Sequence, residues 1–335
     1  MAEHSRQALV GAIGGTYISL AIADIDELTV SNFALLNTAD FEQPMEAVER
    51  YLASIPRCPN KVGLAVAATV SGDRAKFAHR DWVLTRNDVR AATGADHVSM
   101  INDFDALALS LPSLSKYDLH ELNAGQAVPY ATKAVIGAGT GLGIAGLLHV
   151  GNTWTVVGGE GGYMSFPAPA DGEFDIRRVF PAGSFVSYDD VFSGRGLIAL
   201  YNGLRAEAKE PAKRLGARAI ATVALAREDP FAVRSLELMA TWLGRFAGDI
   251  ALLYGARGGL YLAGGLVANT IPALETGHFR QAFESKGGHS AYLAEIPVRV
   301  IKTAADAGLR GAAIALANSL PATPTGTKRV TSKAS

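Results

Sequence analysis

Cysteine is almost absent from the sequence, and histidine is sparse and scattered. The single cysteine, Cys58, excludes an intramolecular disulfide and a metal site built from several cysteines. None of the seven histidines pairs with another at the spacing that places two metal ligands on one helix face. We therefore expect neither a disulfide framework nor structural zinc.

The sequence also lacks an excess of charge of either sign and a long uncharged apolar run. Its 31 basic and 32 acidic residues leave a formal net charge of -1, and the basic residues are dispersed, which argues against a nucleic-acid surface. The apolar stretch of residues 236–268 is interrupted by Arg245, Asp249 and Arg257, so no window of about 20 residues could span a bilayer. The N-terminal residues have neither the basic start nor the apolar core of a signal peptide. We expect a cytoplasmic protein without nucleic-acid or membrane partners.

Glycine, by contrast, is abundant, and it is concentrated where apolar runs meet. Residues 133–149 contain two apolar runs separated by Gly137, Gly139, Gly141 and Gly143. An apolar run, a glycine turn and a second apolar run predict a β-hairpin. Without side chains in the way, successive backbone N–H groups can converge on an anion such as phosphate. The segment matches neither the P-loop nor the dinucleotide-binding fingerprint, so an ordinary glycine-rich hairpin is the alternative.

A similar hairpin is predicted near the N-terminus, over residues 8–24. The two hairpins align when Gly11 is placed on Gly137 and Gly15 on Gly141, an offset of 126 residues in both cases. Such a repeat, in a chain of 335 residues of which 49% are hydrophobic, predicts two lobes of similar topology. Two glycine turns that face one another across a cleft could hold the phosphates of a nucleotide from both sides.

The first lobe is expected to contain strands and helices in alternation. Hydrophobic residues at helical spacing predict a helix over residues 44–55, and a buried strand is expected over residues 61–70. Trp82 is expected in a polar loop. A short helix over residues 87–93 and a short apolar strand over residues 98–101 follow.

Asn102 and Asp103 follow that strand directly. The period near 3.6 in the apolar residues beyond them predicts a helix that begins at or just after Asp103. Chemistry is common at such junctions in α/β proteins, because they lie at the carboxyl end of a strand and beside the N-terminus of a helix. A carboxylate such as Asp103 could accept the proton of an attacking hydroxyl. Alternatively, Asp103 could serve only as the N-cap of the helix.

The second lobe contains the strongest helix prediction, over residues 235–255. Before it, Glu160 lies between two pairs of glycines, which would let its loop approach a ligand. After it, a buried strand over residues 258–268 is expected to end in Gly264 and Gly265, where a flat ligand could approach the backbone. We expect a last strand over residues 296–301 and a last helix over residues 304–320. A disordered polar tail is expected over residues 321–335.

Taken together, these motifs resemble those of the bacterial glucokinases, which belong to the hexokinase and actin superfamily. The matching segments are VGAIGGT at 10–16, INDF at 101–104, GAGTGLG at 137–143, GEGG at 159–162, SGRGL at 193–197 and LAGG at 262–265. The resemblance covers residues 8–320. It implies an α/β, two-lobed, ribonuclease H-like fold of the actin/hexokinase type, with a mixed sheet flanked by helices in each lobe. The small domain would comprise residues 1–108 plus 301–320, and the large domain residues 109–300.

The resemblance also implies an activity, the transfer of the γ-phosphate of ATP to the 6-hydroxyl of glucose with the help of Mg²⁺. Asp103 would be the general base, and Asn102 and Glu160 would bind the sugar. Mg²⁺ would be held mainly by ATP, without direct protein ligands. The residues that would bind ATP lie in the two glycine turns and the later glycine pair: Gly11, Ala12, Ile13, Gly14, Gly15, Thr16, Gly137, Gly139, Thr140, Gly141, Gly264 and Gly265. A homodimer is also in keeping with the resemblance.

Three positions depart from the family pattern. Ala12 stands where an Asp would help to hold Mg²⁺ through water. Tyr163 replaces a sugar-binding His, and Asp189 replaces a Glu, although both residues would still face the sugar. Two hypotheses follow. The protein is a glucokinase for glucose or a related hexose, with slow turnover or a shifted sugar preference, or it is a weak or inactive sugar-binding or regulatory relative.

Overall fold

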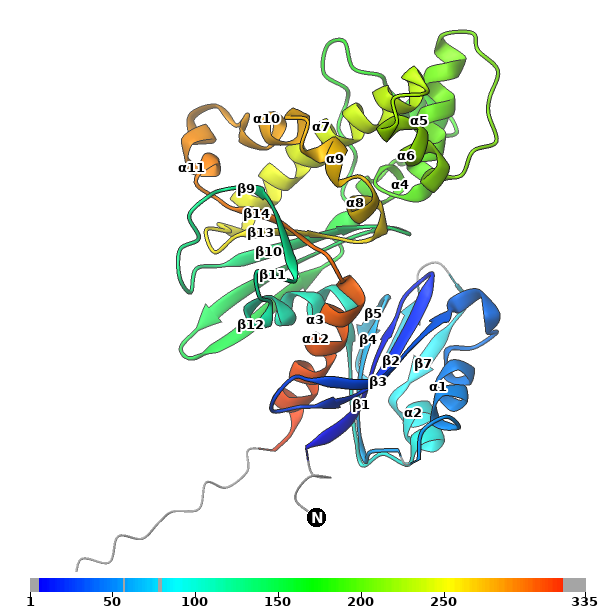
Figure 1. Cartoon of the computed structure of the whole chain (residues 1–335), viewed down its shortest axis with the longest axis vertical. Helices are drawn as coiled ribbons and strands as arrows, with labels where there is room; N and C mark the ends of the chain where they lie inside the picture. The colour runs from blue at the N-terminus through cyan, green and yellow to red at the C-terminus, as the bar shows by residue number, and fades with distance from the viewer. Residues whose placement is uncertain (1–5, 57, 78–79, 322–335) are drawn as a thin grey trace, which may run out of the picture.

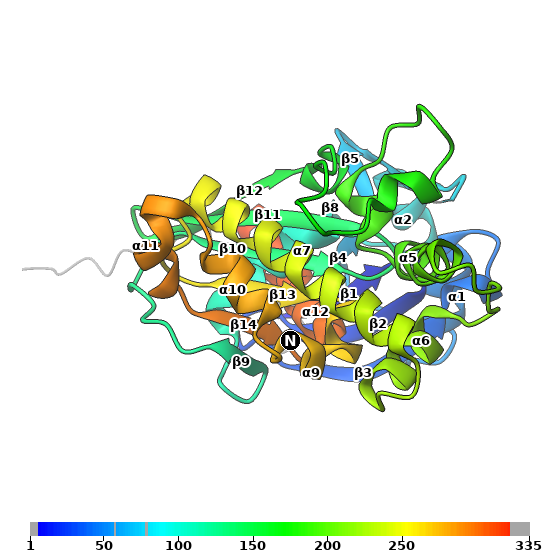
Figure 2. The same cartoon turned by 90° about the horizontal axis from the view of Figure 1, so that it is seen from above.

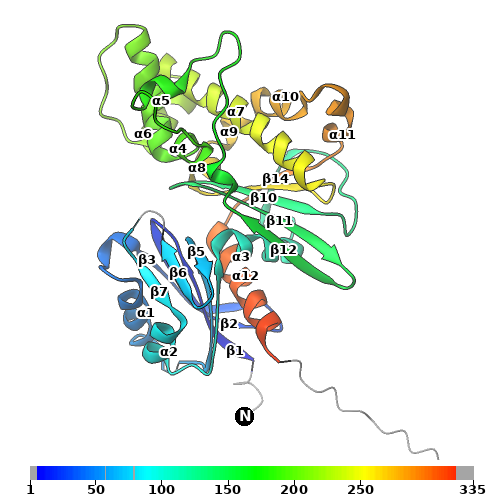
Figure 3. The same cartoon turned by 180° about the vertical axis from the view of Figure 1, so that it is seen from behind.

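The computed structural model describes residues 6–56, 58–77 and 80–321, and it contains two main β-sheets in separate lobes (Figure 1). The first sheet has five strands in the order β3-β2-β1-β4-β8, and the second has six in the order β12-β11-β10-β13-β14-β9. Helix α3 (Asp103–Ser110) and the first part of α12 (Ala304–Ser319) lie between the two sheets, as the view from behind also shows (Figure 3). The predicted α/β fold with two lobes and a mixed sheet in each is confirmed.

The first sheet is covered by apolar layers on both faces. Its strands are β1 (Gln7–Ile13), β2 (Tyr17–Asp24), β3 (Val30–Asn37), β4 (Lys61–Val66) and β8 (His97–Asn102). Because side chains alternate along a strand, Leu9 packs on the side of α1 (Pro44–Leu52) and α2 (Arg86–Thr93), whereas Val10 packs on the side of α12. Helix α12 approaches closely at Gly63, where a Cβ atom would lie 2.7 Å from the carbonyl oxygen of Ala312.

A third, small sheet extends the first core, and the sequence does not predict it. It consists of β5 (Ala68–Ser71), β6 (Arg74–Phe77) and β7 (Val83–Thr85). The single strand expected over residues 61–70 is therefore wrong. The chain leaves the first sheet at Ala67, whose N–H donates to the carbonyl oxygen of Ile13 (2.9 Å). Trp82 lies just before β7, outside the strands, as the predicted loop requires, but its surroundings are apolar: Trp82 is 4% exposed and meets the ring of Phe77 edge-on.

The second sheet carries a thick helical layer on one face. Its strands are β9 (Leu119–Asn123), β10 (Lys133–Ala138), β11 (Leu142–Val150), β12 (Thr153–Gly159), β13 (Leu260–Ala263) and β14 (Val298–Ile301). The long helix α7 (Pro230–Tyr254) crosses this layer, seen from above in Figure 2, with α5 (Gly194–Glu207), α6 (Ala217–Leu225) and α10 (His278–Glu284). Helix α7 begins before the predicted residue 235 because Asp229 caps it, accepting hydrogen bonds from the N–H groups of Phe231 and Ala232. The short helices are α4 (Tyr188–Val191), α8 (Gly265–Asn269), α9 (Ile271–Leu274) and α11 (Ser290–Ala294).

The predicted internal repeat is confirmed as two hairpins in equivalent places. Strands β1 and β2 pair antiparallel, as do β10 and β11. In each lobe the first strand of the hairpin also pairs in parallel with a later strand, β4 in one lobe and β13 in the other. The two glycine turns therefore occupy corresponding positions in the two sheets.

Most of the remaining element predictions are confirmed within a few residues. Helix α3 begins at Asp103, as predicted, whereas the strand expected over residues 258–268 is confined to β13, because Gly264 turns the chain into α8. No helix in the described part of the chain is long and apolar enough to cross a membrane. The tail expected to be disordered falls almost wholly on residues 322–335, which lie outside the described residues. The domain boundaries and the homodimer stay predictions.

Candidate active site

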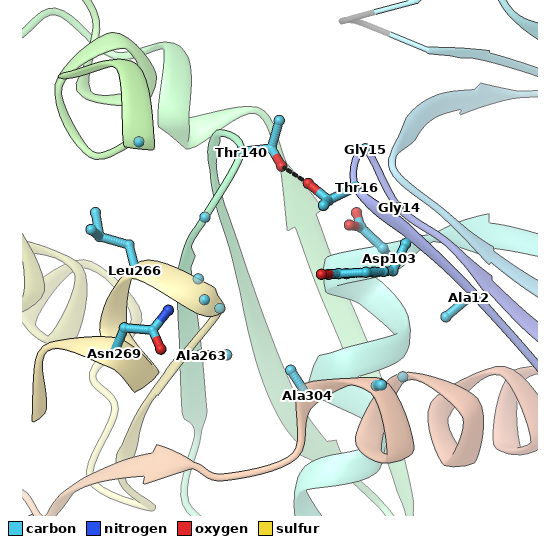
Figure 4. Close-up of a pocket in the computed structure, with 18 of the residues that line it drawn as sticks. Ala12, Gly14, Gly15, Thr16, Asp103, Thr140, Ala263, Leu266, Asn269 and Ala304 are labelled. Carbon is cyan, nitrogen blue, oxygen red and sulfur yellow. Dashed lines mark hydrogen bonds between the residues drawn. The ribbon is translucent and has the colours of Figure 1, made fainter. Parts of the chain in front are cut away.

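The two glycine turns meet between the lobes. The hydroxyl groups of Thr16 and Thr140 lie 3.0 Å apart and form a hydrogen bond (Figure 4). The close approach depends on Gly15, where a Cβ atom would lie 3.2 Å from Cγ2 of Thr140. The turns that the sequence places 126 residues apart are thus neighbours, with a cavity on each side of them.

The larger cavity, of about 810 Å³, is lined by most of the predicted nucleotide-binding residues. These are Ala12, Ile13, Gly14, Gly15, Thr16, Gly137, Gly139, Thr140, Gly264 and Gly265. Gly264 has φ of +94°, and a Cβ atom there would lie 2.3 Å from the carbonyl oxygen of Ala138. A Cβ atom at Gly265, by contrast, would meet no packed neighbour within 4 Å. The pair therefore combines one glycine needed for the turn with one that leaves the backbone accessible to a ligand.

Two of the predicted nucleotide-binding residues lie elsewhere. Gly11 is a packing position inside the first sheet, since a Cβ atom there would lie 2.8 Å from the side chains of both Leu20 and Leu64. It does not line either cavity described here. Gly141 lines the smaller cavity instead of the larger one.

The smaller cavity, of about 240 Å³, gathers the residues predicted to bind the sugar. It is lined by Asn102, Asp103, Glu160, Tyr163 and Asp189, with Thr69 from strand β5 of the small third sheet and Arg80 from the segment between β6 and β7. Eight of the described residues line both cavities: Gly14, Gly15, Asp103, Phe104, Gly137, Gly139, Thr140 and Gly264. Asp103 is the one charged residue among these eight.

Asp103 is held at this boundary by the junction of β8 and α3. Asn102 is the N-cap of α3, and its Oδ1 accepts hydrogen bonds from the N–H groups of Phe104 (2.8 Å) and Asp105 (3.4 Å). The capping role considered for Asp103 therefore belongs to Asn102. The side chain of Asp103 extends toward the first glycine turn (Figure 4). Its Oδ1 accepts a hydrogen bond from the Phe104 N–H (3.1 Å), and no group of the described residues donates to its Oδ2.

The surroundings of Asp103 change its acidity. The pKa of Asp103 is raised to about 7, chiefly by burial. The N–H groups of Phe104 and of Asp103 itself partly oppose this rise in pKa, and the negative charges of Asp105 and Glu160 add to it. A carboxyl group with a pKa in this range can accept a proton and release it again near neutral pH.

The aromatic ring of Phe104 fixes the first turn of α3 against the second glycine hairpin. A Cβ atom at Gly137 would lie 2.4 Å from this ring, and one at Gly143 would lie 2.0 Å from it. Side chains at these two positions would push the ring, and Asp103 beside it, out of place. Gly143 thus serves to position Asp103, a role that the hairpin pattern alone does not indicate.

Glu160 and Asn102 both line the smaller cavity, but both already have protein partners. Thr69 donates a hydrogen bond to Oε1 of Glu160 (2.8 Å), so a residue of the first lobe holds a carboxylate of the second. No group of the described residues donates to Oε2 of Glu160. Asn102 donates one amide hydrogen to the carbonyl oxygen of Ala68 (3.2 Å) and retains a second one.

Tyr163 and Asp189 occupy the same cavity in different ways. Tyr163 is 44% exposed, and burial of the rest of the side chain raises the pKa of its hydroxyl. Asp189 is buried, and its Oδ1 accepts a hydrogen bond from the N–H of Leu142 (2.6 Å), at the end of the second glycine turn. The guanidinium of Arg195 lies 4.0 Å from its Oδ2. Asp189 therefore anchors the turn as well as lining the cavity.

The described residues offer few ligands for a metal ion. No three His, Cys, Asp or Glu side chains in the described ranges are grouped so that they could hold one. Ala12 lines the larger cavity, and Asp103 is the one carboxylate among the described residues that line it. This donor set does not fit a site made by the protein alone, but it is compatible with an Mg²⁺ ion that arrives bound to phosphate and water.

Comparisons with known proteins point to one family. The family model for glucokinase matches residues 9–319. The glucokinase of Chelativorans sp. (strain BNC1) is 38% identical, covering 88% of this chain and 86% of that protein, and the glucokinase of Brucella suis biovar 1 is 37% identical with the same coverage. Among solved structures, a glucokinase from an Antarctic psychrotroph is 31% identical with a TM-score of 0.79, covering 94% of this chain and 99% of that one.

Two further solved structures, both with bound ligands, share the fold at lower identity. Glucokinase from Balamuthia mandrillaris in complex with glucose is 22% identical, with a TM-score of 0.78, and covers 93% of this chain and 94% of that one. A ROK family glucokinase from Streptomyces griseus in complex with glucose and AMPPNP is also 22% identical, with a TM-score of 0.65, and covers 92% of this chain and 98% of that one.

Proposed function

The chain belongs to the glucokinase family, and from that premise we propose that it transfers the γ-phosphoryl group of ATP to the 6-hydroxyl of glucose with Asp103 as the general base. The observation that carries the proposal is the place of Asp103. Among the described residues, it is the one charged residue that lines both the cavity with the glycine turns and the cavity with the sugar-binding candidates. A base for this reaction must stand where the two substrates meet.

The proposed step balances with this single base. The oxygen of the 6-hydroxyl forms a bond to the γ-phosphorus, the bond from that phosphorus to the β,γ-bridging oxygen breaks, and ADP leaves. The hydroxyl proton passes to the carboxylate of Asp103. A pKa of about 7 suits this role, because the carboxylate is then basic enough to take the proton while a large fraction stays ionised at neutral pH.

The larger cavity is assigned to ATP. The backbone N–H groups of the two glycine turns and the hydroxyls of Thr16 and Thr140 would bind the phosphates, and the open backbone at Gly265 would face the adenosine. Mg²⁺ bound to the triphosphate would neutralise part of its charge during transfer. Because Ala12 provides no carboxylate, we assign no protein side chain as a direct ligand of this ion.

The smaller cavity is assigned to the hexose. Asn102 retains an amide hydrogen for a sugar hydroxyl, and Oε2 of Glu160 can accept from one. Tyr163 would contribute its hydroxyl and the edge of its ring to the wall. Asp189 would act chiefly by holding Leu142, and therefore the second glycine turn, in position.

The test compares the wild-type protein with Asp103→Asn in two measurements. A coupled assay measures glucose phosphorylation with ATP and Mg²⁺, and calorimetry measures the binding of glucose and of ATP. We expect Asp103→Asn to bind both ligands with near wild-type affinity while kcat falls at least about a hundredfold. Turnover that survives this substitution would overturn the assignment of the base. Wild-type protein that binds glucose but never phosphorylates it would support the alternative of a sugar-binding relative.

A further inference from the structure

We propose that Arg195 binds the terminal phosphates of the nucleotide, at the end of the larger cavity where phosphoryl transfer takes place. This inference rests on the assignment of that cavity to ATP. Arg195 lies on the first turn of α5, and the neighbouring chain is tied to the second glycine turn. The N–H of Gly194 donates to the carbonyl oxygen of Gly139 (3.2 Å), and Ser193 and Gly139 form a parallel β-bridge. Arg195 itself is one of the residues that line the larger cavity.

The position of the guanidinium group indicates which part of a nucleotide it would meet. It lies 4.0 Å from Oδ2 of Asp189, a residue of the smaller cavity. Asp189 is in turn bonded to Leu142, at the end of the second glycine turn. The guanidinium is therefore near the boundary between the cavities, where Asp103 also lies. A nucleotide whose γ-phosphate reaches Asp103 would bring its terminal phosphates to this part of the cavity.

Arg195 has little to hold it in the absence of a ligand. Its side chain is 68% exposed, the described residues accept no hydrogen bond from its guanidinium, and its ion pair with Asp189 is long. Although Asp189 is buried, the guanidinium is exposed to solvent and 4.0 Å away, so the pair contributes little to stability. A cation in the first turn of a helix is also unfavourable, because the N-terminal end of the helix dipole is positive. A bound anion would offset the repulsion between the guanidinium and the positive end of the helix dipole.

The charges of the cavity make such a role useful. Among the described residues, the charged ones that line the larger cavity are Asp103, Arg195 and Arg218. The triphosphate would therefore meet one carboxylate and two arginines. Ala12 cannot help to hold Mg²⁺ through water, which leaves more of the phosphate charge to be balanced by other groups. The planar guanidinium of Arg195 can donate two parallel hydrogen bonds to phosphate oxygens.

The experiment measures the binding of ATP, ADP and adenosine to the full chain by calorimetry, with and without Mg²⁺. The variants are Arg195→Gln, Arg195→Lys and, as a matched control, Arg178→Gln. Arg178 is 71% exposed and lies 3.9 Å from Asp175, so it resembles Arg195 in exposure and pairing, but it lines neither cavity. We expect Arg195→Gln to weaken ATP binding about tenfold to a hundredfold and to leave adenosine binding within about twofold. The ATP affinity of Arg195→Lys should fall between those of the wild type and Arg195→Gln. The ATP affinity of Arg178→Gln should match that of the wild type.

Kinetic measurements separate this role from an indirect one. Arg195→Gln should lower kcat/KM for ATP while the KM for glucose stays unchanged. The proposal is overturned if Arg195→Gln weakens adenosine and ATP binding equally, or if it leaves ATP affinity unchanged. It is also overturned if only the KM for glucose rises, because that result would mean that Arg195 acts through Asp189. The calorimetric measurement of ATP binding does not depend on turnover. A protein that binds ATP without phosphorylating glucose would defeat the proposed function and still decide the role of Arg195, whereas a protein that binds no ATP would defeat both.

Discussion

Replacing the proposed base should make the protein more stable at neutral pH. A carboxyl group held between two lobes in a poorly hydrated position costs free energy whenever it is ionised. Asparagine has nearly the same size as aspartate and carries no charge. Asp103→Asn is therefore expected to remove activity and to raise the free energy of unfolding at the same time.

The size of the effect follows from the pKa. Burial raises the pKa of Asp103 from 3.8 to about 7 in the folded protein. At about 1.4 kcal/mol for each pH unit, the cost of ionising it is about 4 kcal/mol. This figure is an upper bound, because part of the side chain faces the open cavities.

The sign of the pH dependence is fixed by the direction of the shift. Below pH 3.8 the carboxyl is protonated in the folded and the unfolded chain, and it imposes no cost. Between pH 3.8 and about 7 the unfolded chain releases the proton while the folded chain keeps it, so the wild type loses stability as the pH rises. Above about pH 7 the cost is complete.

Urea unfolding of the wild type and Asp103→Asn across this pH range tests the reasoning. The gain from the substitution should be largest at about pH 8 and should disappear near pH 3 to 4. An Asp103→Asn protein that is no more stable than the wild type at pH 8, or a gain that does not vary with pH, would refute the description of Asp103 as a buried carboxyl with a raised pKa.

Three other substitutions give separate tests. Thr69→Val should raise the KM for glucose, because Glu160 loses the hydrogen bond that orients it, whereas Thr69→Ser should keep the wild-type KM. Equal KM values for the wild type and both variants would exclude a role of Thr69 in orienting Glu160. Ala12→Asp should lower the Mg²⁺ concentration that gives half of the maximal rate, and an unchanged Mg²⁺ titration would show that the missing carboxylate is not limiting. In urea titrations, Asp229→Asn should reduce the free energy of unfolding more at neutral pH than at pH 2. Burial alone would raise the pKa of Asp229, but hydrogen bonds, chiefly from Tyr201 and Lys213, bring this pKa to about 2. A loss that is the same at both pH values would contradict that account.

The parts of the fold that the sequence predicts are those set by local pattern. Apolar runs on either side of clustered glycines predict the two hairpins, and the period of the apolar residues predicts helix α3 from Asp103 onward. The third sheet escapes this reasoning because β4 and β5 form one continuous apolar run. The separation of the two strands depends on the bond from Ala67 to Ile13, which is a contact between segments far apart in the chain.

The site was predictable only in part for the same reason. A motif identifies residues near a ligand, but it does not assign the role of each one. Gly11 belongs to the first glycine motif and yet packs inside the sheet, and Asn102, predicted to bind sugar, also caps the helix that carries Asp103. Thr69 lies outside the matching motifs, and Arg195 is the middle residue of SGRGL, a position that the motif does not mark out. Their roles arise from contacts with Glu160 and Asp189 that form only when the chain is folded.

The pH dependence of kcat/KM for glucose, measured with saturating ATP and Mg²⁺, tests the central claim most directly, because this ratio reports on the ionisation of the enzyme before the sugar binds. The account predicts that log kcat/KM falls with unit slope as the pH drops below about 7, the pKa of Asp103, with a plateau above it. A profile that stays flat from pH 8 down to about pH 5 would contradict the claim that Asp103 accepts the proton of the sugar hydroxyl.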